Sequence, residues 1–190
     1  LFYPSAAVLW YHLGTAQLKN GQRDLALKSF EKGMAIDAKE PLCYVGRGYL
    51  SMLENNPQKA KLDFDNALSI TKSKNVNVLQ AISEAYLVDS KFVNDALNLL
   101  SKAQSLDDRD AETHIILGDA YLLRNNGGLA VSSYEKAASL DNKIAKPHYK
   151  IGMVYQRSRN FSGALESFTK AIEVDPGYTL AYKELGELYY

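Results

Sequence analysis

The sequence has little of what marks several common protein classes. Cys43 is the one cysteine among 190 residues, so the chain cannot form an internal disulfide. Lys and Arg number 22, and Asp and Glu also number 22, which gives a formal net charge of zero at pH 7. A chain without excess positive charge lacks the field that gathers phosphate groups, so we expect no nucleic-acid partner.

Long apolar runs are also missing. The longest, such as residues 6–11, are far shorter than the roughly 18 residues that a membrane-spanning helix needs, so no membrane span is expected. No Cys/His cluster has zinc spacing, and no glycine-rich loop ends in Lys followed by Ser or Thr. We therefore expect neither a metal nor a cofactor.

What the sequence does contain is an internal repeat. Units begin at residues 7, 41, 76, 111, 145 and 179, with spacings of 34 or 35 residues. The first half of a unit carries a bulky residue and then an apolar–small pair, as at His114 and Gly118. The second half carries a small residue, an aromatic four residues later and another small residue three further on, as in Ala130, Tyr134 and Ala137.

Offsets of three and four residues predict that each half of a unit is an amphipathic helix of about a dozen residues. Gly, Asn and Pro separate the two halves at residues 20–21, 55–57 and 125–128, where turns are expected. Neither helix can form a core alone, so the units must stack on one another. The prediction is an all-α chain of antiparallel helix hairpins.

This pattern resembles the tetratricopeptide repeat, in which W-x2-L-G-x2-Y and A-x3-F-x2-A segments recur about every 34 residues. The resemblance covers essentially the whole chain and implies a right-handed α-solenoid, with residues 1–190 as a single array. It implies five repeats, at 7–40, 41–75, 76–110, 111–144 and 145–178, with 1–6 ending a preceding repeat and 179–190 forming the first helix of a further one. In the third repeat, one inserted residue is expected in the turn Asp89-Ser90-Lys91.

The resemblance also implies a concave groove lined by the first helix of every unit. The lining is expected to be apolar and aromatic near the N-terminus, acidic in the middle and basic near the C-terminus. We expect a protein or peptide partner to bind there, with an apolar anchor at Tyr11, Val45 and Tyr49. The candidate groove residues are Tyr11, Thr15, Val45, Tyr49, Gln80, Glu84, Glu112, Asp119, Lys146, Tyr149, Lys150 and Met153.

The charged part of this lining has two interpretations. Its acids and lysines could complement charges on a bound peptide. Alternatively, Glu112 or Asp119 could neutralise Lys146 or Lys150 on the next unit, an exposed pair of this kind being worth about 0 to 1 kcal/mol. The clamp by which some members of the family hold the C-terminal carboxylate of chaperones is not expected, because Glu84 would repel a carboxylate.

No catalytic residue is predicted. His114 and His148 occupy the aromatic position of the repeat, so packing explains them, and His12 has no Ser, Cys or acid at triad-like spacing. Cys43 has no adjacent base that would activate a thiolate. The favoured function is a non-catalytic protein-binding scaffold. The alternatives are an architectural segment of a longer repeat protein, self-associating through its unpaired terminal helices, and, less favoured, an RNA-binding helical repeat.

Overall fold

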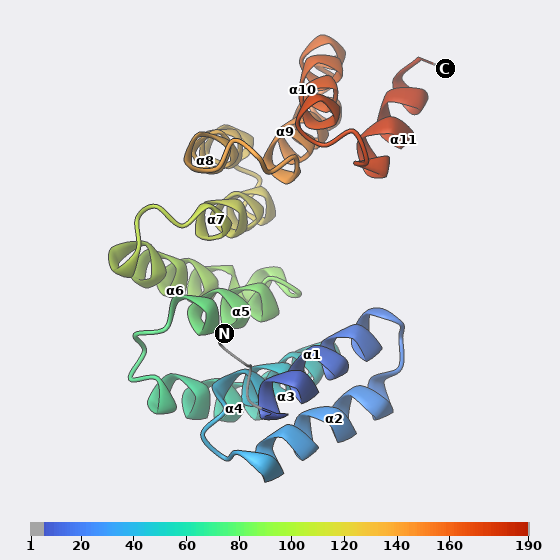
Figure 1. Cartoon of the computed structure of the whole chain (residues 1–190). Helices are drawn as coiled ribbons and strands as arrows, with labels where there is room; N and C mark the ends of the chain where they lie inside the picture. Colours follow the sequence, from blue (N-terminus) through green and yellow to red (C-terminus); the bar gives the residue numbers. More distant parts are fainter. Residues whose placement is uncertain (1–5, 190) are drawn as a thin grey trace. The chain divides into compact units, whose positions relative to one another are not determined.

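The computed structural model describes residues 6–189, and all the regular secondary structure in that range is helical (Figure 1). The elements are α1 (Ala6–Lys19), α2 (Arg23–Ile36), α3 (Pro41–Leu53), α4 (Pro57–Ile70), α5 (Val76–Tyr86), the 3₁₀ helix η1 (Ser90–Phe92), α6 (Val93–Leu106), α7 (Ala111–Leu123), α8 (Gly127–Leu140), α9 (Lys146–Arg157), α10 (Phe161–Val174) and α11 (Thr179–Leu188). The predicted all-α fold of helix hairpins is confirmed. Residues 1–5 lie outside the described part, and with them most of segment 1–6, which was expected to end a preceding repeat.

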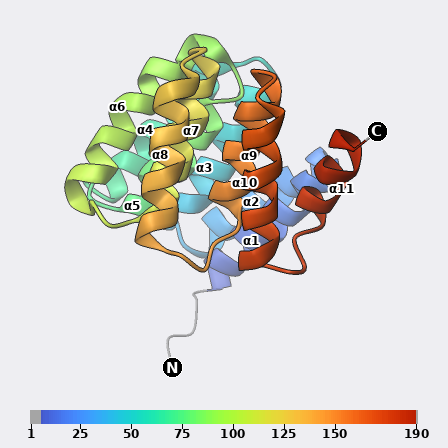
Figure 2. The same ribbon diagram turned by 90° about the horizontal axis from the view of Figure 1, so that it is seen from above.

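The chain forms two compact units, each of which contains several repeats. The first unit ends at Leu106 and the second unit begins at Asp107. In the first unit, α1 pairs with α2, α3 with α4, and α5 with α6. In the second unit, α7 pairs with α8 and α9 with α10, and α11 packs against α10. Figure 2 shows α8 beside α9 in the second unit. Within the described residues, no helix is long and apolar enough to span a membrane.

Each of four hairpins brings a glycine of its first helix against an aromatic ring of its second helix, 16 residues later. The four rings are almost completely buried. A Cβ at any of these glycines would overlap the ring, so the absence of a side chain is what allows the two helices to approach so closely. The pairs are Gly14–Phe30, Gly48–Phe64, Gly118–Tyr134 and Gly152–Phe168.

The turns inside the hairpins repeat one backbone geometry. Gly21, Asn55, Asn125 and Arg159 have φ of 75°, 56°, 56° and 60°, which is the left-handed region. Glycine and asparagine tolerate this region well, whereas an arginine there is unusual. The turn of the α5–α6 hairpin differs, because none of its residues has a left-handed φ and it contains the 3₁₀ helix η1. The sequence predicts one extra residue in this turn.

Side-chain caps then start the second helices. Asn56 Oδ1 accepts a hydrogen bond of 3.1 Å from the backbone N–H of Lys59. Asn126 and Asn160 cap α8 and α10 in the same way. Because each cap satisfies a backbone donor that the helix leaves without a partner, these asparagines define where the second helix of a hairpin begins.

Candidate functional site

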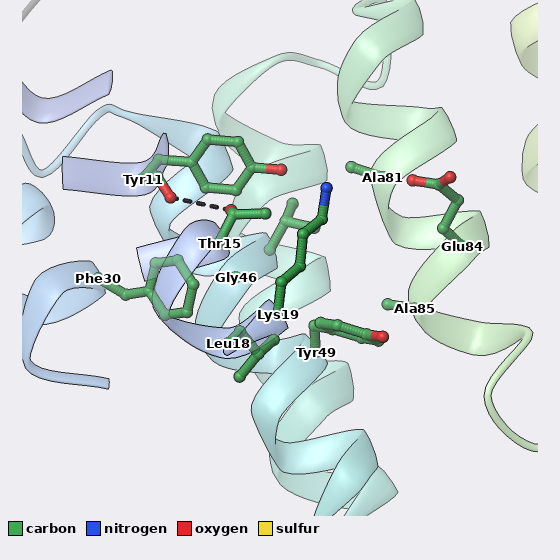
Figure 3. A pocket seen from close by; sticks show the side chains of 11 residues that line it. Tyr11, Thr15, Leu18, Lys19, Phe30, Gly46, Tyr49, Ala81, Glu84 and Ala85 are labelled. Atoms are coloured by element: carbon green, nitrogen blue, oxygen red, sulfur yellow. Dashed lines mark hydrogen bonds between the residues drawn. The ribbon is translucent and has the colours of Figure 1, made fainter. Parts of the chain in front are cut away.

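A pocket of about 300 Å³ opens on the first unit between α1, α3 and α5 (Figure 3). Three consecutive first helices therefore contribute to one site. Five of the predicted groove residues line it, namely Tyr11, Thr15, Val45, Tyr49 and Glu84. The remaining lining residues are Leu18, Lys19, Phe30, Gly46, Ala81 and Ala85.

Small residues at one position of the repeat leave space for this pocket. Gly46 and Ala81 are the sixth residues of two consecutive repeats, where the next two repeats have Ile116 and Lys150. Gly46 also lies against the buried ring of Phe30, and a Cβ there would overlap that ring. The pocket thus depends on a glycine and an alanine that the sequence shows but whose significance only the packing makes clear.

Two tyrosines frame the pocket. The ring of Tyr11 lies 6.1 Å from that of Phe30, and the hydroxyl of Thr15 donates a 2.9 Å hydrogen bond to the backbone carbonyl of Tyr11. Burial raises the pKa of the Tyr11 phenol above its usual value. The hydroxyl of Tyr49 makes no hydrogen bond with a described residue and is available to a ligand.

The rim of the pocket carries charges of both signs. Lys19 extends from α1 and Glu84 from α5, both exposed to solvent (Figure 3). Gln80, which was also predicted to line the groove, is only 8% exposed and does not line this pocket. The first unit therefore offers an apolar and aromatic pocket with a mixed-charge rim.

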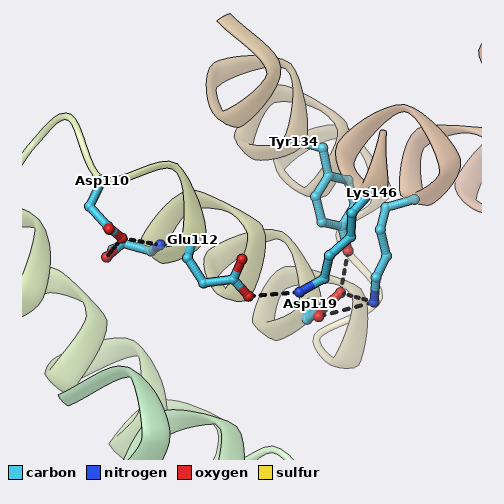
Figure 4. Close-up of polar contacts among 7 residues, drawn as sticks. Asp110, Glu112, Asp119, Tyr134 and Lys146 are labelled. Carbon is cyan, nitrogen blue, oxygen red and sulfur yellow. Dashed lines mark hydrogen bonds and ion pairs between the residues drawn. The ribbon is translucent and has the colours of Figure 1, made fainter. Parts of the chain in front are cut away.

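In the second unit, the charged residues predicted for the groove pair with one another (Figure 4). Lys146 Nζ donates a 2.7 Å hydrogen bond to Glu112, and Lys150 Nζ donates hydrogen bonds of 2.8 and 3.1 Å to the two carboxylate oxygens of Asp119. Asp119 also accepts a 2.6 Å hydrogen bond from the hydroxyl of Tyr134. Burial, and then the Asp119 charge, raise the pKa of Tyr134 above its usual value. Of the two interpretations, the structure therefore agrees with the one in which these four charged residues pair within the protein.

The two apolar groove candidates of the second unit contribute to packing. The ring of Tyr149 lies 5.7 Å from that of Phe168 and 5.5 Å from that of Tyr178. Met153 packs against the same cluster and also lines a shallow pocket at the C-terminal end of α9. Both residues thus take part in packing while remaining half-buried, and their place in a groove stays a prediction.

Two residues with reactive side chains, Cys43 and His114, are buried in the packing of the helices. Cys43 is buried, with its Sγ 3.5 Å from the carbonyl oxygen of Ala7, and burial raises the pKa of the thiol to about 12. The ring of His114 is buried, with its Nε2 3.4 Å from the carbonyl oxygen of Asp108. Among the described residues, no group of three or more His, Cys, Asp or Glu could hold a metal ion.

One buried ion pair was not predicted from the sequence. Arg47 on α3 holds Asp63 on α4 through two hydrogen bonds, and the Asp63 side chain is 3% exposed. The two residues are 16 positions apart, the same spacing that separates Gly48 from Phe64 in this hairpin. That spacing was the signal that could have identified the pair.

Comparison with known proteins places these features in a family context. Residues 7–40 and 145–178 each match a model of the tetratricopeptide repeat. No curated protein matches the sequence.

Solved structures share the fold. TTC0263, a tetratricopeptide-repeat protein of Thermus thermophilus, superposes with a TM-score of 0.79 at 19% identity, covering 97% of this chain and 99% of that one. PilF of Pseudomonas aeruginosa gives a TM-score of 0.66 at 19% identity, covering 96% and 86%. YrrB, described as a tetratricopeptide-repeat protein with an unusual peptide-binding site, gives 0.58 at 23% identity, covering 94% and 91%. At these identities the likeness concerns the fold.

Proposed function

The chain is a tetratricopeptide-repeat protein, and we propose that it is a non-catalytic scaffold whose first unit binds a segment of a partner protein in the pocket between Tyr11 and Tyr49. The family supports a protein-interaction scaffold in general. We propose in addition that the pocket is the binding site and that a peptide segment occupies it. YrrB has the same fold and is described as having an unusual peptide-binding site. This agrees with a peptide as the class of ligand.

The observation that carries the proposal is the pair of small residues, Gly46 and Ala81, that leaves an apolar pocket between two tyrosines. At about 300 Å³, the pocket lies at the small end of ligand sites, which favours one or two side chains of a peptide over a large cofactor. Tyrosines at such a site combine an apolar ring with a hydroxyl that can bind a peptide backbone. We infer that an apolar side chain of the partner enters the pocket.

Filling the pocket from within tests this inference. Peptides selected by the protein from a phage-displayed random library should share an apolar residue. The affinity of one such peptide, measured by fluorescence anisotropy, should fall at least about tenfold in Ala81→Leu, which corresponds to about 1.4 kcal/mol. The new side chain would occupy the space that the peptide needs.

Ala35→Leu is the matched control, because Ala35 is an exposed alanine on α2 that does not line the pocket. It should bind the peptide as the wild type does. Circular dichroism and thermal melting check that both variants fold. Equal binding by Ala81→Leu and the wild type would show that the pocket is not the binding site.

A second candidate function is self-assembly through α11. Gly186 occupies the repeat position of Gly118 and Gly152, yet no described heavy atom lies within 4 Å of a Cβ built there. Leu180 and Tyr182 on the same helix are about half exposed. A helix of a second copy could cover this face, and light scattering of the wild type and of Leu180→Ser/Tyr182→Ser over a range of concentrations tests it. A monomer at every concentration would count against it.

A further inference from the structure

The hairpin turns of the second unit form an edge that carries arginine and no acid. Arg124 follows α7, Arg157 ends α9 and Arg159 lies in the turn before α10, and all three are exposed. We call these residues the arginine edge. Neither residues 120–134 nor residues 151–165 include an Asp or Glu. None of the three arginines makes an ion pair or a side-chain hydrogen bond with a described residue.

The two turns that carry these arginines lie close together. A Cβ at Gly127, the first residue of α8, would lie 3.4 Å from a side-chain carbon of Val154 on α9. Beside this contact is a pocket of about 450 Å³ lined by Leu122, Met153, Val154, Gln156 and Arg157. Arg157 thus joins an aliphatic pocket to the arginine edge.

The positive charge of this edge is a local feature. Residues 107–190 contain 12 Asp and Glu but only 10 Lys and Arg, so the unit as a whole is slightly acidic. Further along α7 and α9, Lys146 and Lys150 are paired with Glu112 and Asp119. The arginine edge therefore places three exposed arginines on stretches of sequence that contain no acid, whereas other exposed cations of this unit, such as Lys136 and Lys143, have an Asp or Glu within two residues.

Helix dipoles do not cancel this charge. Each turn brings together the negative C-terminal end of one helix and the positive N-terminal end of the next, so the two contributions offset each other.

The turns of the first unit differ in composition, because they carry charges of both signs. Asp24 is next to Arg23 in the sequence, and Glu54 is five residues before Lys59. An edge with arginine alone thus distinguishes the second unit.

We propose that the arginine edge binds an acidic segment of a partner protein. One aliphatic side chain of that segment enters the pocket lined by Leu122 and Met153. The carboxylates on either side of it bind Arg157 and the other two guanidiniums. Guanidinium groups suit this task because they bind carboxylates through two parallel hydrogen bonds. The pocket is aliphatic rather than aromatic, so it lacks the stacking surface that single-stranded RNA would use. An acidic peptide therefore fits better than a nucleic acid.

The test uses the whole chain and a defined probe. The probe is a fluorescein-labelled, C-terminally amidated peptide with one leucine flanked on both sides by Asp and Glu. Its dissociation constant should rise about tenfold when Arg124, Arg157 and Arg159 are all changed to Gln, since each rim charge contributes a modest amount. Affinity should also fall when the leucine of the probe is replaced by serine, and when the salt concentration rises.

Matched variants separate the edge from net charge and from the first unit. The triple variant Arg109→Gln/Lys136→Gln/Lys143→Gln removes the same charge from other exposed positions of this unit and should change the affinity less than about twofold. Ala81→Leu should leave binding of this probe unchanged, so failure here and failure of the proposed pocket are distinguishable. Equal losses in the two triple variants, no binding of the probe, or tighter binding of homopolymer RNA that the arginine-edge variant abolishes would each overturn the proposal.

Discussion

Arg47 and Asp63 join the two helices of the second hairpin through a bidentate ion pair. The Nε and one terminal nitrogen of Arg47 donate hydrogen bonds of 2.9 and 2.6 Å to the two oxygens of Asp63. The Asp63 side chain is 3% exposed, whereas that of Arg47 is 27% exposed. The carboxylate therefore depends on this guanidinium in place of water.

Removing the guanidinium should destabilise the protein markedly. Arg47→Ala leaves the carboxylate of Asp63 buried without its partner, and we expect a loss of about 2 kcal/mol or more in the free energy of unfolding, measured by urea denaturation. Lys61→Ala is the control, because Lys61 pairs with Asp65 where both side chains are more than half exposed. That change should cost less than about 0.5 kcal/mol. Equal losses of unfolding free energy in Arg47→Ala and Lys61→Ala would show that the buried ion pair stabilises the protein no more than the exposed one.

Glycine at a helix crossing should be irreplaceable, and glycine at the same repeat position without a facing ring should not. Gly118→Leu would drive its side chain into the ring of Tyr134 and should lower the free energy of unfolding by about 1 to 3 kcal/mol. Gly186→Ala meets no described neighbour and should raise helix stability by up to about 1 kcal/mol. Thermal melting of both variants checks the pair. An unchanged melting temperature in Gly118→Leu would contradict the close approach of Gly118 to the ring of Tyr134.

The left-handed conformation of Arg159 predicts a stabilising change. At the equivalent turn position the chain has Asn125, with φ of 56° against 60° at Arg159. Arg159→Asn should relieve backbone strain and raise the free energy of unfolding by about 0.5 to 1 kcal/mol. The reverse substitution, Asn125→Arg, should lower it by a similar amount. Chemical denaturation of the two variants measures both, and changes of the same sign would argue against a backbone cause.

The buried thiol of Cys43 predicts how stability responds to alkaline pH. Burial raises its pKa from an ordinary value of 9.0 to about 12 in the folded protein. Above pH 9 the unfolded chain releases this proton while the folded chain keeps it, so the unfolded state gains stability. The free energy of unfolding should thus fall as pH rises from about 9 towards 12.

Cys43→Ala isolates this effect from that of other groups. Tyr86, whose pKa burial raises to about 12, and other buried tyrosines also titrate in this range, so the wild-type slope contains more than one contribution. The variant should show a shallower decline between about pH 9 and pH 12, measured by urea denaturation at each pH. Parallel declines in the two proteins would show that the thiol is not protected by burial.

The repeat is visible in the sequence because its causes are local. Apolar residues three and four apart define helices, and Asn and Gly mark the turns. These signals predicted the all-α fold of hairpins without any knowledge of distant contacts. They also placed Tyr11, Val45 and Tyr49 on first helices, and the structure brings these three residues to one pocket.

The tertiary structure decided which side chains meet across units of the repeat. Asp119 and Lys150 are 31 residues apart, and whether they face a ligand or each other depends on where α9 lies relative to α7. The burial of Gln80 and the approach of the Arg124 and Arg157 turns likewise depend on packing between hairpins. Periodicity specifies which face of a helix is apolar. The distances between charged side chains on neighbouring helices arise only when those faces are packed together.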